Sequence, residues 1–310
     1  MDDLRHSLDT RLLASGFAAV LALSACGSED GPALNTSTST SSSATTAASL
    51  PASASPSATS PVARTSRLDA IAVIGHSGAT GYNSTGTDGD ERANSWVTGT
   101  SPKVASIYQR LLATHPGLKN HAYNAAISGS DSNDLMSQAT EIIGQDPVPD
   151  IVFIQSIDND LQCDGTDAQN LPAFKSRVAG VVRFLQRSIP GVKIYFDDQA
   201  VNVHAYDVVL AKRPGGLDHL NTGDDCNVVK GGKLDRAGEA RLQKLVEQYF
   251  NQLVSICTSV PNCATDGGAL QRIAVADADI SLDMDHFTVP GLAKVAAVVW
   301  DTLPAAWKNG

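Results

Sequence analysis

Short apolar runs recur along the chain from residue 70 onward, and each of them is followed by a segment with helical periodicity. The runs lie at 70–75 (AIAVIG), 121–126 (HAYNAA), 150–156 (DIVFIQS), 192–198 (VKIYFDD) and 272–278 (RIAVADA). Segments with apolar residues three and four positions apart lie at 101–116, 131–145, 171–190, 233–257 and 289–308. Continuous apolar strands separated by helices indicate a parallel sheet that is covered on both faces. We therefore predict a flavodoxin-like α/β fold, a three-layer α/β/α sandwich with a roughly five-stranded parallel sheet.

A different apolar run lies at the N-terminus, where residues 12–25 follow Arg5 and Arg11 and end directly before Cys26. A helix that spans a bilayer needs about 20 apolar residues, so this run is too short, but its length suits a secretory signal. Its ending, Leu-Ser-Ala-Cys, resembles the bacterial lipoprotein signal, in which the cysteine is lipidated and becomes the mature N-terminus. We predict a lipoprotein signal peptide at 1–25 and a lipid on Cys26; an ordinary cleaved signal is the alternative.

Composition changes after the cysteine, because residues 26–67 are rich in Ser, Thr, Ala and Pro and hold almost no large aliphatic side chain. Such a stretch buries too little apolar surface to offset the entropy that ordering costs. We predict a disordered tether at 26–67 and a single folded domain at 68–310, a length that suits one domain.

The formal net charge is −10. No cluster of Lys and Arg interrupts this acidic balance, so the sequence offers no footprint for a phosphate backbone and we do not expect nucleic acid binding. We expect the protein to be a monomer that meets the membrane through its N-terminal lipid.

Cysteine usage agrees with export, since four cysteines remain when Cys26 is assigned to lipid. Four cysteines in an exported domain favour two disulfides. Cys257 and Cys263 flank the turn-prone TSVPN, so we pair them, which leaves Cys163 with Cys226. Free buried thiols are the alternative.

The first candidate for chemistry is the Gly-His-Ser-Gly corner at 75–78, which follows the first predicted strand. It lacks the lysine of a P-loop and the glycine spacing of a dinucleotide fingerprint, and Ala79 replaces the last glycine of a nucleophile elbow. What remains is Ser77 on a tight turn at the carboxyl end of a strand, where ligands of such sheets bind. On this stretch alone, a bare structural corner is the favoured interpretation.

A second candidate lies near the C-terminus, where Asp283 precedes His286 by three residues. Residues spaced in this way are neighbours on one helical turn, so the carboxylate can reach the imidazole and hold it as the base for a serine. Asp285 is adjacent to the histidine and is expected to point elsewhere. Two further stretches, NAAISGSDS and IQSIDNDLQCD, follow the second and third strands. They supply a backbone N–H at Gly129 and a side-chain amide at Asn159, both suited to an oxyanion.

These four blocks, in this order at strand ends, resemble the SGNH (GDSL-type) hydrolase family over residues 68–310. The resemblance implies that Ser77 is the nucleophile, His286 the base and Asp283 its orienter. It also implies an oxyanion hole formed by the N–H groups of Ser77 and Gly129 and the amide of Asn159. Two positions depart from the family pattern: His76 replaces an aspartate, and Ile157 stands where a glycine is frequent.

The resemblance implies an esterase, lipase or acetylesterase that cleaves carboxylic esters through an acyl-enzyme, without a cofactor. No H-E-x-x-H motif or paired C-x-x-C supports a metal site. We expect the protein to be exported, either lipid-anchored to the outer face of the bacterial cytoplasmic membrane or secreted, and to act on small-molecule, lipid or glycan esters. The alternative is a non-catalytic envelope binding or scaffold module on the same fold.

Overall fold

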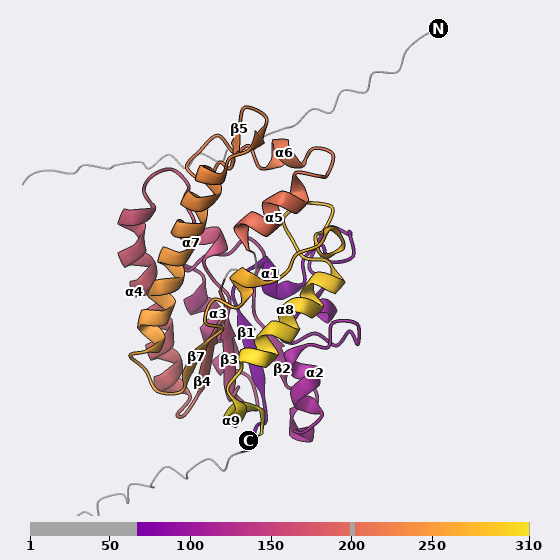
Figure 1. Cartoon of the computed structure of the whole chain (residues 1–310). Helices are drawn as coiled ribbons and strands as arrows, with labels where there is room; N and C mark the ends of the chain where they lie inside the picture. The colour runs from indigo at the N-terminus through magenta and orange to yellow at the C-terminus, as the bar shows by residue number, and fades with distance from the viewer. Residues whose placement is uncertain (1–66, 199–201, 310) are drawn as a thin grey trace, which may run out of the picture. The chain divides into compact units, whose positions relative to one another are not determined.

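The computed structural model describes residues 67–198 and 202–309 (Figure 1). The predicted signal peptide at 1–25, the lipidation site at Cys26 and nearly all of the tether lie outside the described residues. Within the described part of the chain, none of the helices combines the length and the apolarity that crossing a membrane requires.

The centre of the fold is a five-stranded parallel sheet, which confirms the predicted α/β sandwich. Its strand order is β2-β1-β3-β4-β7, the flavodoxin-like arrangement. In this order the second strand lies on one side of β1, and the later strands are added one after another on the other side. The strands are β1 (Ile71–Ile74), β2 (Ala122–Asn124), β3 (Ile151–Ile154), β4 (Lys193–Phe196) and β7 (Cys263–Thr265).

Alternate side chains of the strands fill two separate cores, one on each face of the sheet. Ile71 and Val73 point to the face that α2 and α8 cover, whereas Ala72 and Ile74 point to the face that α3, α4 and α7 cover (Figure 1). All four of these side chains are fully buried, which explains why the run is continuously apolar. The helices are α1 (Ser77–Thr80), α2 (Ile107–Leu112), α3 (Leu135–Ile143), α4 (Asp167–Ser188), α5 (Val203–Leu210), α6 (Gly216–His219), α7 (Arg236–Cys257), α8 (Val289–Thr302) and α9 (Ala305–Lys308).

The prediction of the fifth strand at 272–278 is wrong. The fifth strand is β7, a three-residue strand that begins at Cys263 and pairs with β4 on the side opposite to β3. The run at 272–278 instead begins at the last residue of the short 3₁₀ helix η4 (Leu270–Arg272) and extends into the 3₁₀ helix η5 (Asp277–Asp279). Its Ile273 is buried in the core beneath α8, so the run is apolar because it packs, although it pairs with no strand.

The long stretch after β4, which shows no clear helical period in sequence, contains more structure than we expected. It holds α5, α6 and a small hairpin of β5 (Val229–Lys230) and β6 (Lys233–Leu234). This region forms a third, smaller apolar cluster around Leu210, Leu220 and Ile280, so it packs against the segment that precedes α8.

Both predicted disulfides are present, Cys163–Cys226 and Cys257–Cys263. The second closes the turn between α7 and β7. The first joins the loop after β3 to the loop between α6 and β5, two segments that are 63 residues apart in sequence.

Candidate active site

The corner after β1 is shaped by the close approach of its backbone to β3. Gly75 has φ +140°, and a Cβ atom at this position would lie 2.1 Å from the carbonyl oxygen of Gln155. Its N–H and carbonyl are both held by the side chain of Gln138, which is buried. Only glycine fits this position, and Ser77 follows as the first residue of α1.

His76 caps the N-terminus of α1 at this corner. It is the N-cap of α1, and its Nδ1 accepts the N–H of Gly78 at 3.3 Å. Burial lowers the pKa of His76 further than the carboxylate of Asp158 raises it. The ring is therefore neutral near pH 7 and carries its proton on Nε2, since Nδ1 is an acceptor.

The structure brings Ser77, His286 and Asp283 together. Ser77 Oγ lies 2.8 Å from His286 Nε2, and His286 Nδ1 lies 2.8 Å from Asp283 Oδ2. These three residues come from α1 and from the turn before α8, and the two contacts form a continuous chain from carboxylate to imidazole to hydroxyl. An imidazole held in this way can accept the hydroxyl proton on Nε2 while Nδ1–H stays bonded to the carboxylate.

Asp283 is held in its ionised form by four donors. Partial burial raises its pKa, but hydrogen bonds from the backbone N–H groups of His286 and Asp285 and from the side chains of Asn83 and His286 outweigh this effect, so the pKa is lowered. The amide of Asn83 is 2.6 Å from Asp283 Oδ2. Sequence reasoning missed Asn83; its left-handed backbone, φ +55°, is compatible with asparagine but gives no signal of this contact.

Asp285, which we expected to point elsewhere, lies farther from the imidazole than Asp283 does. Its nearest oxygen is 3.8 Å from His286 Nδ1, and 66% of its side chain is exposed. The expected helical turn is absent, however: Asp283 and His286 lie in a turn in which Met284 has φ +65°, and α8 begins only at Val289. The i,i+3 proximity therefore comes from a tight turn and not from a helix.

The two expected oxyanion donors lie on neighbouring loops. Gly129 is exposed, with φ +80°, and its N–H has no acceptor among the described residues. Asn159 is exposed in the 3₁₀ helix η3 (Asp158–Asp160), and its Nδ2 donates to the carbonyl of Ser130 at 2.8 Å. This bond ties the loop after β3 to the loop after β2, so the two donors are positioned relative to each other.

Ile157, at the start of the third block, carries visible backbone strain. It has φ +103° and is fully buried, a conformation that costs on the order of 1–3 kcal/mol for a residue with a branched side chain. Burial of the isoleucine side chain in the core of α3 and α4 offsets this cost. Ile157, which stands where the sequence resemblance led us to expect a glycine, thus has a backbone conformation that is typical of glycine.

A cavity of about 100 Å³ opens beside Ser77 and His286. Gly129 and Asn159 are not among the residues that line it. Trp96, Leu292 and Val295 are almost fully buried, whereas Asp285 is largely exposed, so the cavity has an apolar inner part and a polar mouth. The lining residues are His76, Ser77, Gly78, Gly81, Tyr82, Trp96, Gln155, Asp158, Tyr206, Asp285, His286, Phe287, Leu292 and Val295.

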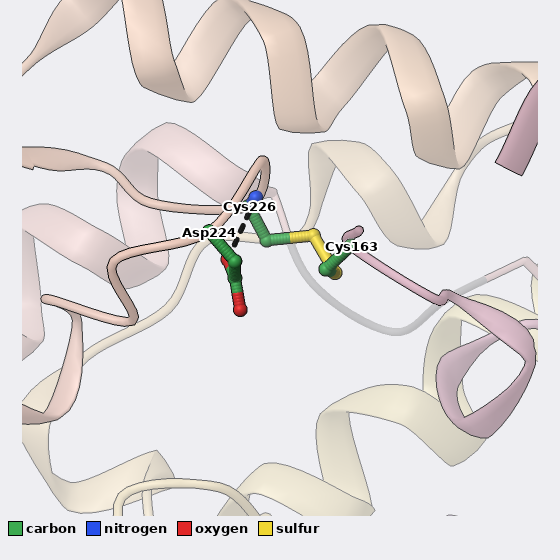
Figure 2. A group of neighbouring side chains, drawn as sticks. All are labelled: Cys163, Asp224 and Cys226. Carbon is green, nitrogen blue, oxygen red and sulfur yellow. Dashed lines mark hydrogen bonds between the residues drawn. A yellow bond between two sulfur atoms is a disulfide. The ribbon is translucent and has the colours of Figure 1, made fainter. Parts of the chain in front are cut away.

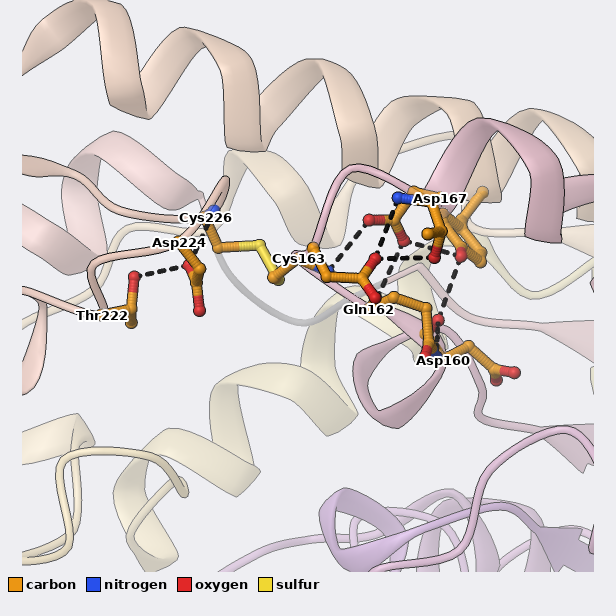
Figure 3. Close-up of a disulfide and its surroundings, with 10 residues drawn as sticks. Asp160, Gln162, Cys163, Asp167, Thr222, Asp224 and Cys226 are labelled. Atoms are coloured by element: carbon orange, nitrogen blue, oxygen red, sulfur yellow. Dashed lines mark hydrogen bonds between the residues drawn. A yellow bond between two sulfur atoms is a disulfide. The ribbon is translucent and has the colours of Figure 1, made fainter.

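The loop that carries Asn159 is fixed by buried polar contacts and by the first disulfide (Figure 3). Asp167 at the start of α4 accepts the N–H groups of Gln162 and Cys163, each at 2.9 Å. Asp160 binds Ser132 from the loop after β2 and lies 3.6 Å from Arg177.

One group of residues in the described part of the chain has the composition of a metal site, and Figure 2 shows it: Cys163, Asp224 and Cys226. The two sulfurs are bonded to each other, so neither is a thiolate ligand. Asp224 accepts the N–H of Cys226 at 2.9 Å, which is a turn contact next to the disulfide.

No protein-family model and no curated protein matches the chain. Among solved structures, an extracellular lipase from Streptomyces rimosus is 14% identical, with 75% of this chain and 98% of that chain covered and a TM-score of 0.47. A phospholipase A1 from Streptomyces albidoflavus is 11% identical, with 76% and 99% covered and a TM-score of 0.47. An acetylxylan esterase from Geobacillus stearothermophilus is 16% identical, with 77% and 95% covered and a TM-score of 0.44. Likenesses this distant say nothing about the activity of the present chain.

Proposed function

We propose that this protein is an extracytoplasmic serine hydrolase that cleaves carboxylic esters through an acyl-enzyme. The observation that carries the proposal is the contact chain from Asp283 through His286 to Ser77, with both distances at 2.8 Å. The preference for esters rests on the resemblance of the four motifs to SGNH hydrolases.

In this proposal Ser77 Oγ attacks the ester carbonyl while His286 Nε2 takes its proton, and Asp283 stabilises the imidazolium. The tetrahedral oxyanion accepts hydrogen bonds from the N–H groups of Ser77 and Gly129 and from the amide of Asn159. The bond to the alcohol oxygen then breaks, and that oxygen takes the proton from His286. Water, deprotonated by the same imidazole, attacks the acyl group and releases the acid from Ser77.

A fluorophosphonate probe, which forms a covalent bond with activated serines, tests the nucleophile. We expect stoichiometric labelling of the wild-type protein at Ser77, located by peptide mass spectrometry, and no labelling of Ser77→Ala. Ser137→Ala is the matched control, because Ser137 is exposed on α3 and its hydroxyl donates to the carbonyl of Asp134. An unlabelled wild-type protein that is folded would instead favour a non-catalytic binding or scaffold module.

The proposal of an extracytoplasmic location rests on the two disulfides, which persist in oxidising compartments, and on the N-terminal sequence. The proposed lipid on Cys26 would hold the hydrolase at the outer face of the membrane through the 26–67 tether.

A further inference from the structure

The turn that carries Asp283 and His286 is organised around Ser281, which is buried. The N–H of Ser281 donates to the carbonyl of His286 at 2.7 Å, and its own carbonyl accepts the N–H of Met284 at 3.2 Å. Its hydroxyl donates to the carbonyl of Asn83 at 2.7 Å, and the amide of Asn83 in turn binds Asp283. The position of Ser281 therefore determines where the base and its orienting carboxylate lie.

An arginine from a distant part of the chain binds the segment that leads into this turn. Arg213 Nη1 donates to the carbonyl of Ser281 at 2.7 Å, and Nη2 donates to the carbonyl of Ile280 at 2.8 Å. The carbonyl of Asp277 also accepts from Nη2, and the carboxylate of Asp277 accepts from Nε. Three main-chain carbonyls of residues 277–281 thus converge on the guanidinium of Arg213, whose side chain is only 15% exposed.

The shape of an arginine side chain suits this contact, whereas that of a lysine does not. A guanidinium carries five N–H donors in a rigid plane, so it can serve several carbonyls at once. Lysine would keep the positive charge and could still pair with the exposed carboxylate of Asp277. Its single ammonium nitrogen cannot, however, take the place of the three nitrogens that make the bonds of Arg213.

The backbone of Arg213 is itself fixed in the tight turn between α5 and α6. Its N–H donates to the carbonyl of Leu210 at 2.8 Å, and its carbonyl accepts the N–H of Gly216 at 3.0 Å. The two helices approach so closely that a Cβ atom at Gly216 would lie 1.8 Å from the carbonyl oxygen of Leu210. Leu210 also belongs to the apolar cluster that contains Ile280, so packing and hydrogen bonds place the arginine against the same segment.

The same region is joined at its other end to the loop that carries Asn159. We call residues 203–226 the α5–α6 segment; it ends at Cys226, whose disulfide partner Cys163 lies four residues after Asn159. In Figure 1, α5 and α6 lie at the same end of the sheet as α1, the helix that begins with Ser77. The α5–α6 segment therefore connects the turn of the proposed base with the loop of a proposed oxyanion donor.

We propose that Arg213 is a positioning residue of the hydrolase, which fixes the turn of Asp283 and His286 where His286 can take the proton of Ser77. This role rests on the proposed function, because it consists in aligning the base with the nucleophile. Arg213 is not among the residues that line the cavity beside Ser77, so it acts through the turn and not on the substrate. Its replacement should therefore change kcat, which depends on this alignment, more than KM.

Arg213→Lys tests the proposal, and Arg183→Lys, at an exposed position of α4, is the matched control. With p-nitrophenyl acetate we expect Arg213→Lys to lower kcat by about 10–10²-fold and to leave KM within about twofold, because small displacements of a catalytic group have effects of this size. Arg183→Lys should leave both constants as in the wild type. The kinetics are measured well below the melting transition of each variant, so that a loss of stability does not enter them.

Hydrogen exchange measured by NMR reports on the turn itself and needs no turnover. The amides of Ser281 and Met284 close the turn, and we expect them to exchange about tenfold faster or more in Arg213→Lys, as expected for local opening. The amide of Val152 in β3, in the middle of the sheet, should keep its wild-type rate. In Arg183→Lys all three rates should stay as in the wild type.

Unchanged exchange at Ser281 and Met284 in Arg213→Lys would overturn the proposal, because Arg213 would then not fix the turn. Faster exchange with an unchanged kcat would overturn it as well, since Arg213 would then only add stability. A folded wild-type protein that neither hydrolyses esters nor reacts with the fluorophosphonate would contradict the proposed function. Even then the exchange rates would decide whether Arg213 holds the turn of Asp283 and His286 in place.

Discussion

At the scale of single residues, the site separates two acidic side chains that the sequence places only two positions apart. Asp283 accepts bonds from His286 and Asn83, whereas Asp285 is mostly exposed and 3.8 Å from the imidazole. An orienting carboxylate fixes the tautomer of the base, so its loss leaves Nε2 protonated and unable to accept the serine proton.

Asp283→Asn should therefore lower kcat by about 10⁴ for a neutral ester such as p-nitrophenyl acetate. Asp285→Asn should lower it far less, because this carboxylate makes no close bond to the ring. Steady-state kinetics of the two variants, with circular dichroism to establish folding, make the comparison. Should Asp285 be the more sensitive position, the orienting role belongs to it instead.

Asn159 gives a second prediction at this scale. Its amide is exposed and is held by the carbonyl of Ser130, which leaves its other N–H for a substrate oxygen. Removing one oxyanion donor costs about 10²–10³ in kcat, or roughly 2.7–4 kcal/mol. We expect Asn159→Ala to show this loss with little change in KM, because the bond strengthens only in the transition state. A change confined to KM would mean that Asn159 only binds substrate.

At the scale of elements, the sequence was most informative where local pattern and packing agree. Four of the five strands lie where continuous apolar runs predict them. The fifth was missed because β7 is only three residues long and of mixed polarity, and it directly follows the turn that the Cys257–Cys263 disulfide closes. Asn83 was missed for a similar reason, since its contact joins residues 200 positions apart and leaves no local pattern.

Asp207 on α5 and Glu239 on α7 form a buried acidic pair that predicts a pH-dependent stability. Burial, together with Glu239 on α7, raises the pKa of Asp207 to about 7. Asp207 Oδ2 and Glu239 Oε1 are both buried and have no hydrogen-bond partner among the described residues, and the other oxygen of Glu239 binds His204 at 2.6 Å. In the unfolded chain an aspartate titrates near pH 4. Between about pH 4 and pH 7 the folded state therefore holds a proton that the unfolded state has lost, and the free energy of unfolding falls as pH rises.

Asp207→Asn mimics the protonated acid and should remove this pH dependence of the free energy of unfolding. We expect the variant to gain stability over the wild type as pH rises from 5 to 8, by on the order of 1–4 kcal/mol at pH 8. Urea unfolding at several pH values measures the difference, with the exposed Asp218→Asn on α6 as the control. A difference that does not change with pH would show that the Asp207 carboxyl titrates normally.

The Cys163–Cys226 disulfide connects α6 and the small hairpin region to the loop that carries Asn159 (Figure 3). A bridge at this place either shapes substrate binding or only adds stability, typically about 2–4 kcal/mol. We expect Cys163→Ser/Cys226→Ser to lower the melting temperature and also to change the preference among p-nitrophenyl esters of different chain length, measured well below the melting transition. The Cys257→Ser/Cys263→Ser variant, whose bridge lies at the turn between α7 and β7, should lower the melting temperature alone. An unchanged preference in the first variant would leave only the stabilising role.

At the scale of the whole molecule, the folded domain and the N-terminal sequence make separate predictions. Residues 68–310 supply all of the proposed catalytic groups, so the domain should keep its activity without the first 67 residues.

The predicted lipid on Cys26 should instead determine where the enzyme is found. Cys26→Ala in the full chain should abolish labelling by a palmitate analogue and move the protein from the membrane fraction to the medium or to the precursor pool, with kcat/KM of the folded domain unchanged. Ser24→Ala, two residues before the cysteine, is the control and should remain lipidated. A protein that is released with a cleaved N-terminus and without lipid in the wild type would show that residues 1–25 act as an ordinary signal. In that case the enzyme would act as a secreted protein, free of the restriction to esters within reach of the 26–67 tether.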